Sequence, residues 1–129
     1  MNMSWQMLLA VGSGGFLGAI LRFYMAFHIA KIFPHAIPIA TLSVNIIGSF
    51  AIGALAALLM TFTPSNELRA FLITGVLGAL TTYSTFALET YFLLNSSIVL
   101  ALVNILLNVI STILSVAIGY KLCLWAINY

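Results

Sequence analysis

The chain has 129 residues, of which 64% are hydrophobic and 5% are charged, and its formal net charge is +2. A soluble domain carries roughly 25% charged residues, so this composition excludes a soluble fold and predicts an integral membrane protein. The charge comes from four basic and two acidic residues, which are too few to indicate a nucleic acid or an acidic partner. The single cysteine, Cys123, excludes an internal disulfide bond.

Apolar stretches predict four transmembrane helices in a single domain over residues 1–129. A spanning helix needs about 20 residues, so the chain has room for four or five spans joined by short loops. The first helix is expected over about residues 5–29; it has no basic segment before it and no clear cleavage site, so we interpret it as a retained span. A loop with Pro34 and Pro38 follows, and the second helix is expected over about residues 39–60.

The third helix is expected over about residues 68–94, after a turn in which Ser65 or Asn66 caps the helix. We expect a tight turn at residues 95–97 and the fourth helix over about residues 98–125. Four spans place both termini on the same side of the membrane. The predicted fold class is therefore an all-α membrane protein with four transmembrane helices.

Basic residues near the span ends give no preference for one orientation. Arg22 and Lys31 lie on the side of the first loop, and Arg69 and Lys121 lie on the side of the second loop and the termini. Basic residues normally select the cytoplasmic side, so either other features fix the orientation or the chain inserts both ways. Insertion in both orientations would make an antiparallel homodimer natural. Four helices are also too few to enclose a path for a polar solute, which favours an oligomer.

The middle of the third span is the most polar part of any predicted helix. Residues 75–90 contain two glycines, five serines or threonines and a carboxylate. One interpretation is a regular helix whose hydroxyls bond to carbonyls one turn earlier. The other is a broken helix whose released carbonyls coordinate a small cation. Tyr83 and Phe86 are three residues apart and share a face, either as core packing or with ring edges that lie against an anion.

Three more residues carry polar chemistry near or within the membrane. Asn45 is either an interhelical hydrogen-bonding group or a donor aimed at an anion. Glu89, the one acid well inside a span, is a proton carrier, a cation ligand or a hydrogen-bonded structural group. Arg22 either extends its charge toward the interface or attracts anions at an entrance.

The fourth span has a polar face that cannot look toward lipid. Its side chains either join helices by hydrogen bonds or line a path. The residues are Asn104, Asn108, Ser111, Thr112 and Ser115. The chain has no aspartate, no cluster of histidine and cysteine, no catalytic triad and no phosphate-binding loop, so an enzyme is not expected.

Three stretches resemble the successive signatures of the CrcB/Fluc fluoride channels, and the resemblance covers essentially the whole chain, including its length and four-span layout. They are residues 15–22 (GFLGAILR), 41–48 (TLSVNIIG) and 75–86 (GVLGALTTYSTF). The resemblance implies a passive channel that exports fluoride and so reduces its toxicity. It further implies an antiparallel homodimer of dual topology, with two pores and a third helix that is broken near its middle, from Gly78 to Thr81.

The resemblance also assigns roles to individual residues. It implies a structural sodium ion, not transported, that is held by the backbone carbonyls of Gly78 and Thr81 from both subunits. It implies that Asn45 is a pore donor. The remaining pore or anion-binding positions are Tyr83, Phe86, Ser84, Thr85 and Glu89 in the third span and Asn108, Ser111, Thr112 and Ser115 in the fourth, with Arg22 at the entrance.

Tyr83 departs from the family pattern, because phenylalanine is usual at this first ring position. The ring edge is kept and a hydroxyl is added, which either donates to fluoride or a neighbour or narrows the path. The expected location is the plasma membrane of a bacterium or archaeon. Two rival functions stay open: a small proton-coupled exporter of the multidrug type, in which Glu89 would carry the proton, and a non-conducting scaffold subunit.

Overall fold

The computed structural model describes residues 4–129, and this part of the chain folds into four helices long and apolar enough to span a membrane. The spans are α1 (Trp5–Ile32), α2 (Ile39–Thr61), a composite third span and α6 (Ile98–Asn128). The composite span consists of α3 (Asn66–Arg69), the π-helix η1 (Ala70–Leu77), α4 (Gly78–Leu80) and α5 (Tyr83–Ser96). The predicted all-α fold with four transmembrane helices and a broken third helix is confirmed.

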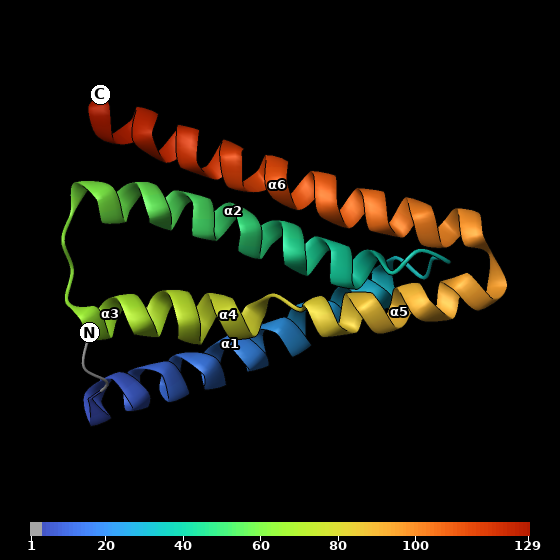
Figure 1. The fold of residues 1–129 in the computed structure, drawn as a ribbon, viewed down its shortest axis with the longest axis horizontal. Coiled ribbons are helices and arrows are strands. Elements are labelled where there is room, and N and C mark those ends of the chain that lie inside the picture. Colours follow the sequence, from blue (N-terminus) through green and yellow to red (C-terminus); the bar gives the residue numbers. More distant parts are fainter. Residues whose placement is uncertain (1–3) are drawn as a thin grey trace.

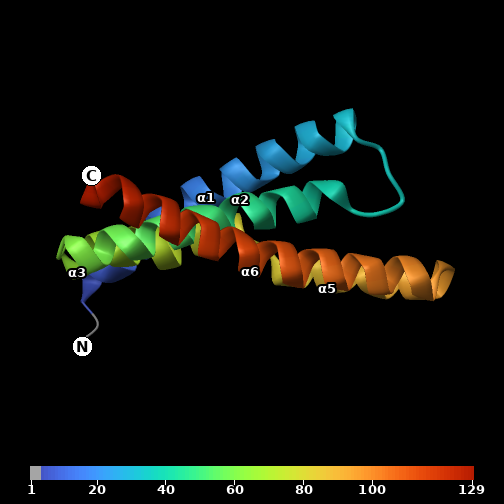
Figure 2. The ribbon, with the colours of Figure 1, turned by 90° about the horizontal axis from the view of Figure 1, so that it is seen from above.

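The two halves of the third span pack against different neighbours. The first half, η1 and α4, lies along α1, whereas the second half, α5, lies along α6. Helices α2 and α6 run side by side over most of their length, and both termini lie at the same end of the bundle (Figure 1). At the opposite end, α1 and α5 splay apart in the view from above (Figure 2). The break therefore lets one span change partners in the middle of the membrane.

Glycines set the distance between the packed helices. A Cβ on Gly18 of α1 would clash with the backbone carbonyl of Val76 in η1, and a Cβ on Gly53 of α2 would clash with that of Val116 in α6. Small residues at such contacts allow helix backbones to approach closely in lipid, where van der Waals packing drives association. Gly18 and Gly53 therefore act in helix packing.

The tight turn that the sequence predicts at residues 95–97 is present but is shorter than predicted. Helix α5 continues to Ser96, and Ser97 alone separates it from α6. The Ser97 N–H donates to the carbonyl of Leu93 and so closes α5, while its hydroxyl accepts from the N–H of Leu100 and caps α6. One residue satisfies the ends of both helices, because a cap needs a single extended residue with a side-chain acceptor. Four of the eight span ends extend two or three residues beyond the prediction, and the others agree with it to within one residue.

The break in the third span begins later than the sequence predicts. Gly78 is helical, with φ −64° and ψ −33°, and the extended residues are Thr81, with ψ 155°, and Thr82, with φ −146°. The π-helix before it was not predicted. Its backbone bonds include one from the Gly78 N–H to the Ile73 carbonyl, five residues earlier. Segments of π-helix are rare and often lie next to functional sites.

Candidate anion pathway beside the helix break

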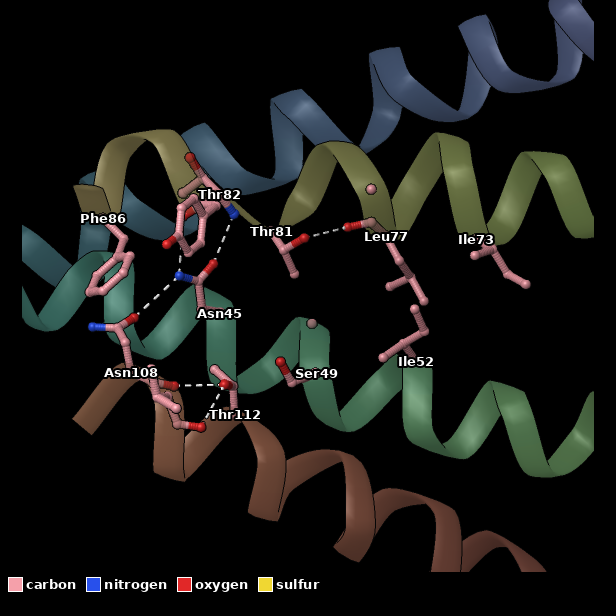
Figure 3. A pocket seen from close by; sticks show the side chains of 14 residues that line it. Asn45, Ser49, Ile52, Ile73, Leu77, Thr81, Thr82, Phe86, Asn108 and Thr112 are labelled. Carbon is pink, nitrogen blue, oxygen red and sulfur yellow. Dashed lines mark hydrogen bonds between the residues drawn. The ribbon is translucent and has the colours of Figure 1, made fainter. Parts of the chain in front are cut away.

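A cavity of about 480 Å³ lies beside the break, between the third span and helices α2 and α6 (Figure 3). Its wall offers one carboxamide from α2 and another from α6, several hydroxyls and two aromatic rings, and none of its lining residues is charged. The lining residues are Asn45, Gly48, Ser49, Ile52, Ile73, Leu77, Gly78, Thr81, Thr82, Tyr83, Phe86, Asn108, Val109 and Thr112.

Asn45 holds the backbone of the break. Its Oδ1 accepts from the N–H of Thr82 at 2.8 Å, and its Nδ2 donates to the carbonyl of Thr82 at 3.2 Å (Figure 3). Both backbone groups would otherwise lie in a low-dielectric environment without their helical partners, at a cost of several kcal/mol each in hydrocarbon. One buried carboxamide thus replaces the helical bonds that the break removes.

The break also leaves two carbonyls without the N–H groups that would bond to them in a continuous helix. In a continuous helix the Gly78 carbonyl would accept from the N–H of Thr82, but this N–H donates to Asn45. The Thr81 carbonyl would accept from the N–H of Thr85, but this N–H donates to the hydroxyl of Thr82. Carbonyl oxygens without their helical donors are suited to a small hard cation. The break thus leaves two backbone oxygens, of Gly78 and Thr81, of the kind that coordinates a small cation.

From Asn45 a chain of buried polar groups continues through α6 to α5. Its Nδ2 donates to Oδ1 of Asn108 at 3.3 Å, and Nδ2 of Asn108 donates to Oδ1 of Asn104 at 3.2 Å. Nδ2 of Asn104 donates to the hydroxyl of Thr90 at 2.9 Å, and this hydroxyl donates to the carbonyl of Phe86 at 2.7 Å. We call these bonds, from Thr82 through Asn45 to Phe86, the amide chain.

Tyr83 and Phe86 form an edge-to-face pair at the start of α5, with ring centroids 5.4 Å apart and planes at 63°. Phe86 is buried, but Tyr83 is 79% exposed on this single chain. A ring edge carries the positive part of the aromatic quadrupole. Both residues line the cavity, so the pair adds aromatic surface to its wall without a full charge.

A second cavity of about 270 Å³ lies between α1, α2 and the start of α5. Arg22 and Thr85 line it together with Thr41 and Thr82. The hydroxyl of Thr41 also donates to Oε1 of Glu89 at 2.7 Å, while the buried Oε2 accepts no hydrogen bond from residues 4–129. The predicted entrance residue Arg22 is therefore separated from the main cavity, and Thr82 lies between the two cavities.

The predicted site residues thus fall into three groups. The main cavity brings together Asn45, Tyr83, Phe86, Asn108 and Thr112 with Gly78 and Thr81. The second cavity holds Arg22 and Thr85. Neither cavity is lined by Ser84, Glu89, Ser111 or Ser115.

The residues that line neither cavity point away from both or bond to neighbouring groups. Ser84 is on an exposed face of α5, and the Ser111 hydroxyl donates to the carbonyl of Leu107 in its own helix. Glu89 faces α2 through its bond with Thr41. The functional roles of all these residues stay predictions.

The structure also adds residues that the sequence did not single out as site residues. Ser49 and Thr82 line the main cavity. Asn104 is fully buried and Thr90 nearly so, and both belong to the amide chain. Helical spacing had already placed Asn104 on the polar face of the fourth span, four residues before Asn108, but it gave Asn104 no role at the site.

Known proteins resemble this chain over most of its length. Residues 9–120 match the family model described as CrcB-like protein, Camphor Resistance (CrcB). A fluoride-specific ion channel FluC of Sulfurimonas denitrificans is 55% identical over 120 residues, which cover 92% of this chain and 93% of the relative. The proteins of the same name from Nitratiruptor sp. and Campylobacter fetus are 49% and 45% identical, and the matched regions cover 86% or more of each sequence. These relatives are ion channels by name, not enzymes.

Proposed function

Because the chain belongs to the CrcB family, we propose that it is a passive, fluoride-selective channel that exports fluoride from the cytoplasm. It is a multi-pass protein of a bacterial membrane, as its four spanning helices and its bacterial relatives indicate. The names of these relatives give the substrate. For this chain, the lining of the cavity beside the break supports the same substrate on physical grounds.

The uncharged polar wall of the main cavity is the observation that carries this proposal. Fluoride is small and strongly hydrated, so a pore must replace much of its water shell and still release it. In this structure the N–H groups of Asn45 donate to Thr82 and Asn108, and the Thr112 hydroxyl donates to the Asn108 carbonyl. Uncharged groups of this kind would have to exchange these bonds for bonds to the ion, and they would hold it less tightly than a buried lysine or arginine. No charged side chain lines this cavity. The proposed pore therefore offers polar groups that can bind fluoride, and it has no full charge that would hold the ion.

An antiparallel homodimer with two pores completes the proposal. Tyr83 is 79% exposed, and Gly78, Ser84 and Thr85 are also exposed on one chain. Exposed polar groups in the middle of a span are costly in lipid, so a second copy covering this face would stabilise them. The balance of Arg22 and Lys31 against Arg69 and Lys121 agrees with insertion in both orientations.

A structural sodium ion at the dimer axis fits the residues present. The carbonyls of Gly78 and Thr81 would hold it, because the N–H groups that would bond them in a helix donate elsewhere. Among residues 4–129 no cluster of three histidine, cysteine or acidic residues offers a different metal site. The ion would supply positive charge that joins the two chains at their breaks, and it would not be transported.

The experiment is anion efflux from liposomes that contain the purified wild-type protein. Vesicles loaded with fluoride should release it without a proton gradient, whereas vesicles loaded with chloride should not. Equal release of both anions would contradict selectivity. Release that depends on a proton gradient would support the exporter, and the absence of any flux would support the scaffold.

A further inference from the structure

The amide chain has a direction that is fixed at both ends. It begins at the backbone N–H of Thr82, which can only donate, and it ends at the backbone carbonyl of Phe86, which can only accept. Each carboxamide between them must therefore accept from the preceding group and donate to the next one. Reversing a single carboxamide would place donor against donor, so the orientation of Asn45 at the cavity depends on groups farther along the chain.

The far members of this chain do not line either cavity. Asn104 is 0% exposed and Thr90 is 7% exposed. Asn104 uses its Oδ1 to accept from Asn108 and its Nδ2 to donate to Thr90, so these groups are directed at protein rather than at an ion. In a low-dielectric interior such a series of bonds strengthens each member, and an unsatisfied member is costly.

These bonds also fix the position of α5. The break leaves α5 joined to the first half of its span only through the extended residues Thr81 and Thr82, so backbone helix bonds do not set its angle. Side-chain contacts with α2 and α6 hold it instead, and one of them is the bond from Thr41 to Glu89. Asn45 binds its N-cap residue Thr82, and Asn104 binds Thr90 two turns later. Phe86 lies between these two contacts.

We propose that Asn104 and Thr90 are positioning residues for anion conduction, which act through Asn108 and Asn45 on the cavity and through α5 on the ring of Phe86. This inference rests on the proposed fluoride channel, but it concerns residues that touch neither the cavity nor the break. On this view, the part of the polar face of α6 that contains Asn104 sets the geometry of the pathway.

The test compares variants that keep the side-chain shape. Asn104→Leu and Thr90→Val remove hydrogen-bonding atoms with little change of outline. Thr61→Val is the matched control, because the Thr61 hydroxyl also donates to a carbonyl four residues earlier, at 3.3 Å, but lies outside the amide chain. Each protein is examined by size-exclusion chromatography and thermal unfolding. Each is then reconstituted for separate fluoride and chloride efflux measurements.

We expect folded Thr90→Val and Asn104→Leu proteins to release fluoride about tenfold more slowly than the wild type, which corresponds to about 1.4 kcal/mol. The ratio of chloride to fluoride release should rise, and Thr61→Val should match the wild type. Because the two residues act in one series, the double variant should lose no more than the slower single variant. If Asn104→Leu does not fold, Thr90→Val alone decides the test.

Wild-type fluoride rates and selectivity in the folded variants would overturn this inference and leave the proposed function intact. Fully additive losses in the double variant would also overturn it, since they would mean independent sites. A wild-type protein that releases no fluoride would contradict the proposed function itself, and the inference with it.

Discussion

The carboxamide of Asn45 and the backbone of Thr82 are joined by two hydrogen bonds, of 2.8 Å and 3.2 Å, although the residues are 37 positions apart in sequence. This contact stabilises the interrupted, polar part of the third span within the membrane. It satisfies the two backbone groups that the break exposes. It also diverts the N–H that would otherwise bond to Gly78.

Asn45→Leu should impair both stability and conduction. Leucine matches the shape of asparagine but leaves the N–H and carbonyl of Thr82 without partners, so the free energy of unfolding should fall by about 1–3 kcal/mol per buried group. Thermal unfolding in detergent and fluoride efflux from liposomes measure the two effects. Asn95, which is exposed near the end of α5, provides the control Asn95→Leu. An unchanged melting temperature in Asn45→Leu would show that the hydrogen bonds between Asn45 and Thr82 do not stabilise the protein.

Tyr83→Phe should preserve fluoride conduction, and Tyr83→Leu should reduce it. The edge-to-face contact with Phe86 needs a ring but not a hydroxyl, and such pairs contribute about 0.5–1.5 kcal/mol beyond burial. We therefore expect Tyr83→Leu to slow efflux by up to about tenfold. If Tyr83→Phe slows fluoride release as much as Tyr83→Leu does, the hydroxyl rather than the ring edge is the functional group.

Gly18→Ala should destabilise the protein, whereas Gly12→Ala should not. A methyl group at Gly18 would meet the backbone carbonyl of Val76, while nothing lies within 4 Å of the same position at Gly12. Overpacking of this kind costs about 1–3 kcal/mol. Both glycines are in α1, so thermal unfolding of the two variants compares the same substitution in the same helix. Equal melting temperatures would show that α1 and η1 do not pack as described.

Glu89→Gln should leave passive fluoride efflux within about threefold of the wild-type rate, a difference of less than 1 kcal/mol. Glutamine keeps the oxygen that accepts from Thr41, but it cannot carry a proton. The measurement is efflux with and without an imposed proton gradient. Abolished transport in this variant, together with gradient dependence in the wild type, would favour the proton-coupled exporter.

Replacing sodium with a large organic cation should weaken the proposed dimer. The carbonyls of Gly78 and Thr81 can approach a small ion closely, whereas a bulky cation cannot enter between them. Size-exclusion chromatography in buffers that differ only in the cation measures the change. Restoring sodium should restore the dimer. A dimer that withstands prolonged sodium removal with full fluoride efflux would exclude a structural ion at the break.

The sequence by itself determined the membrane location and the four spans, whereas the break in the third helix was one of two interpretations and was favoured only by the family resemblance. These properties follow from composition and local hydropathy, because lipid requires long apolar segments whatever their partners are. The polar stretch at residues 75–90 was visible for the same reason, since its hydroxyls and glycines stand out against an apolar background. Family signatures then suggested which residues line a pathway.

Only the tertiary structure decided where the helix breaks and which polar groups meet. The break falls at Thr81 and Thr82 rather than at Gly78, because Asn45 on another helix competes for the N–H of Thr82. Likewise, spacing placed Asn104 on a polar face but could not show that it bonds to Thr90 on α5. A helical period fixes the face of a side chain, whereas its partner depends on how separate helices pack. For that reason the amide chain became visible only once the helices were assembled.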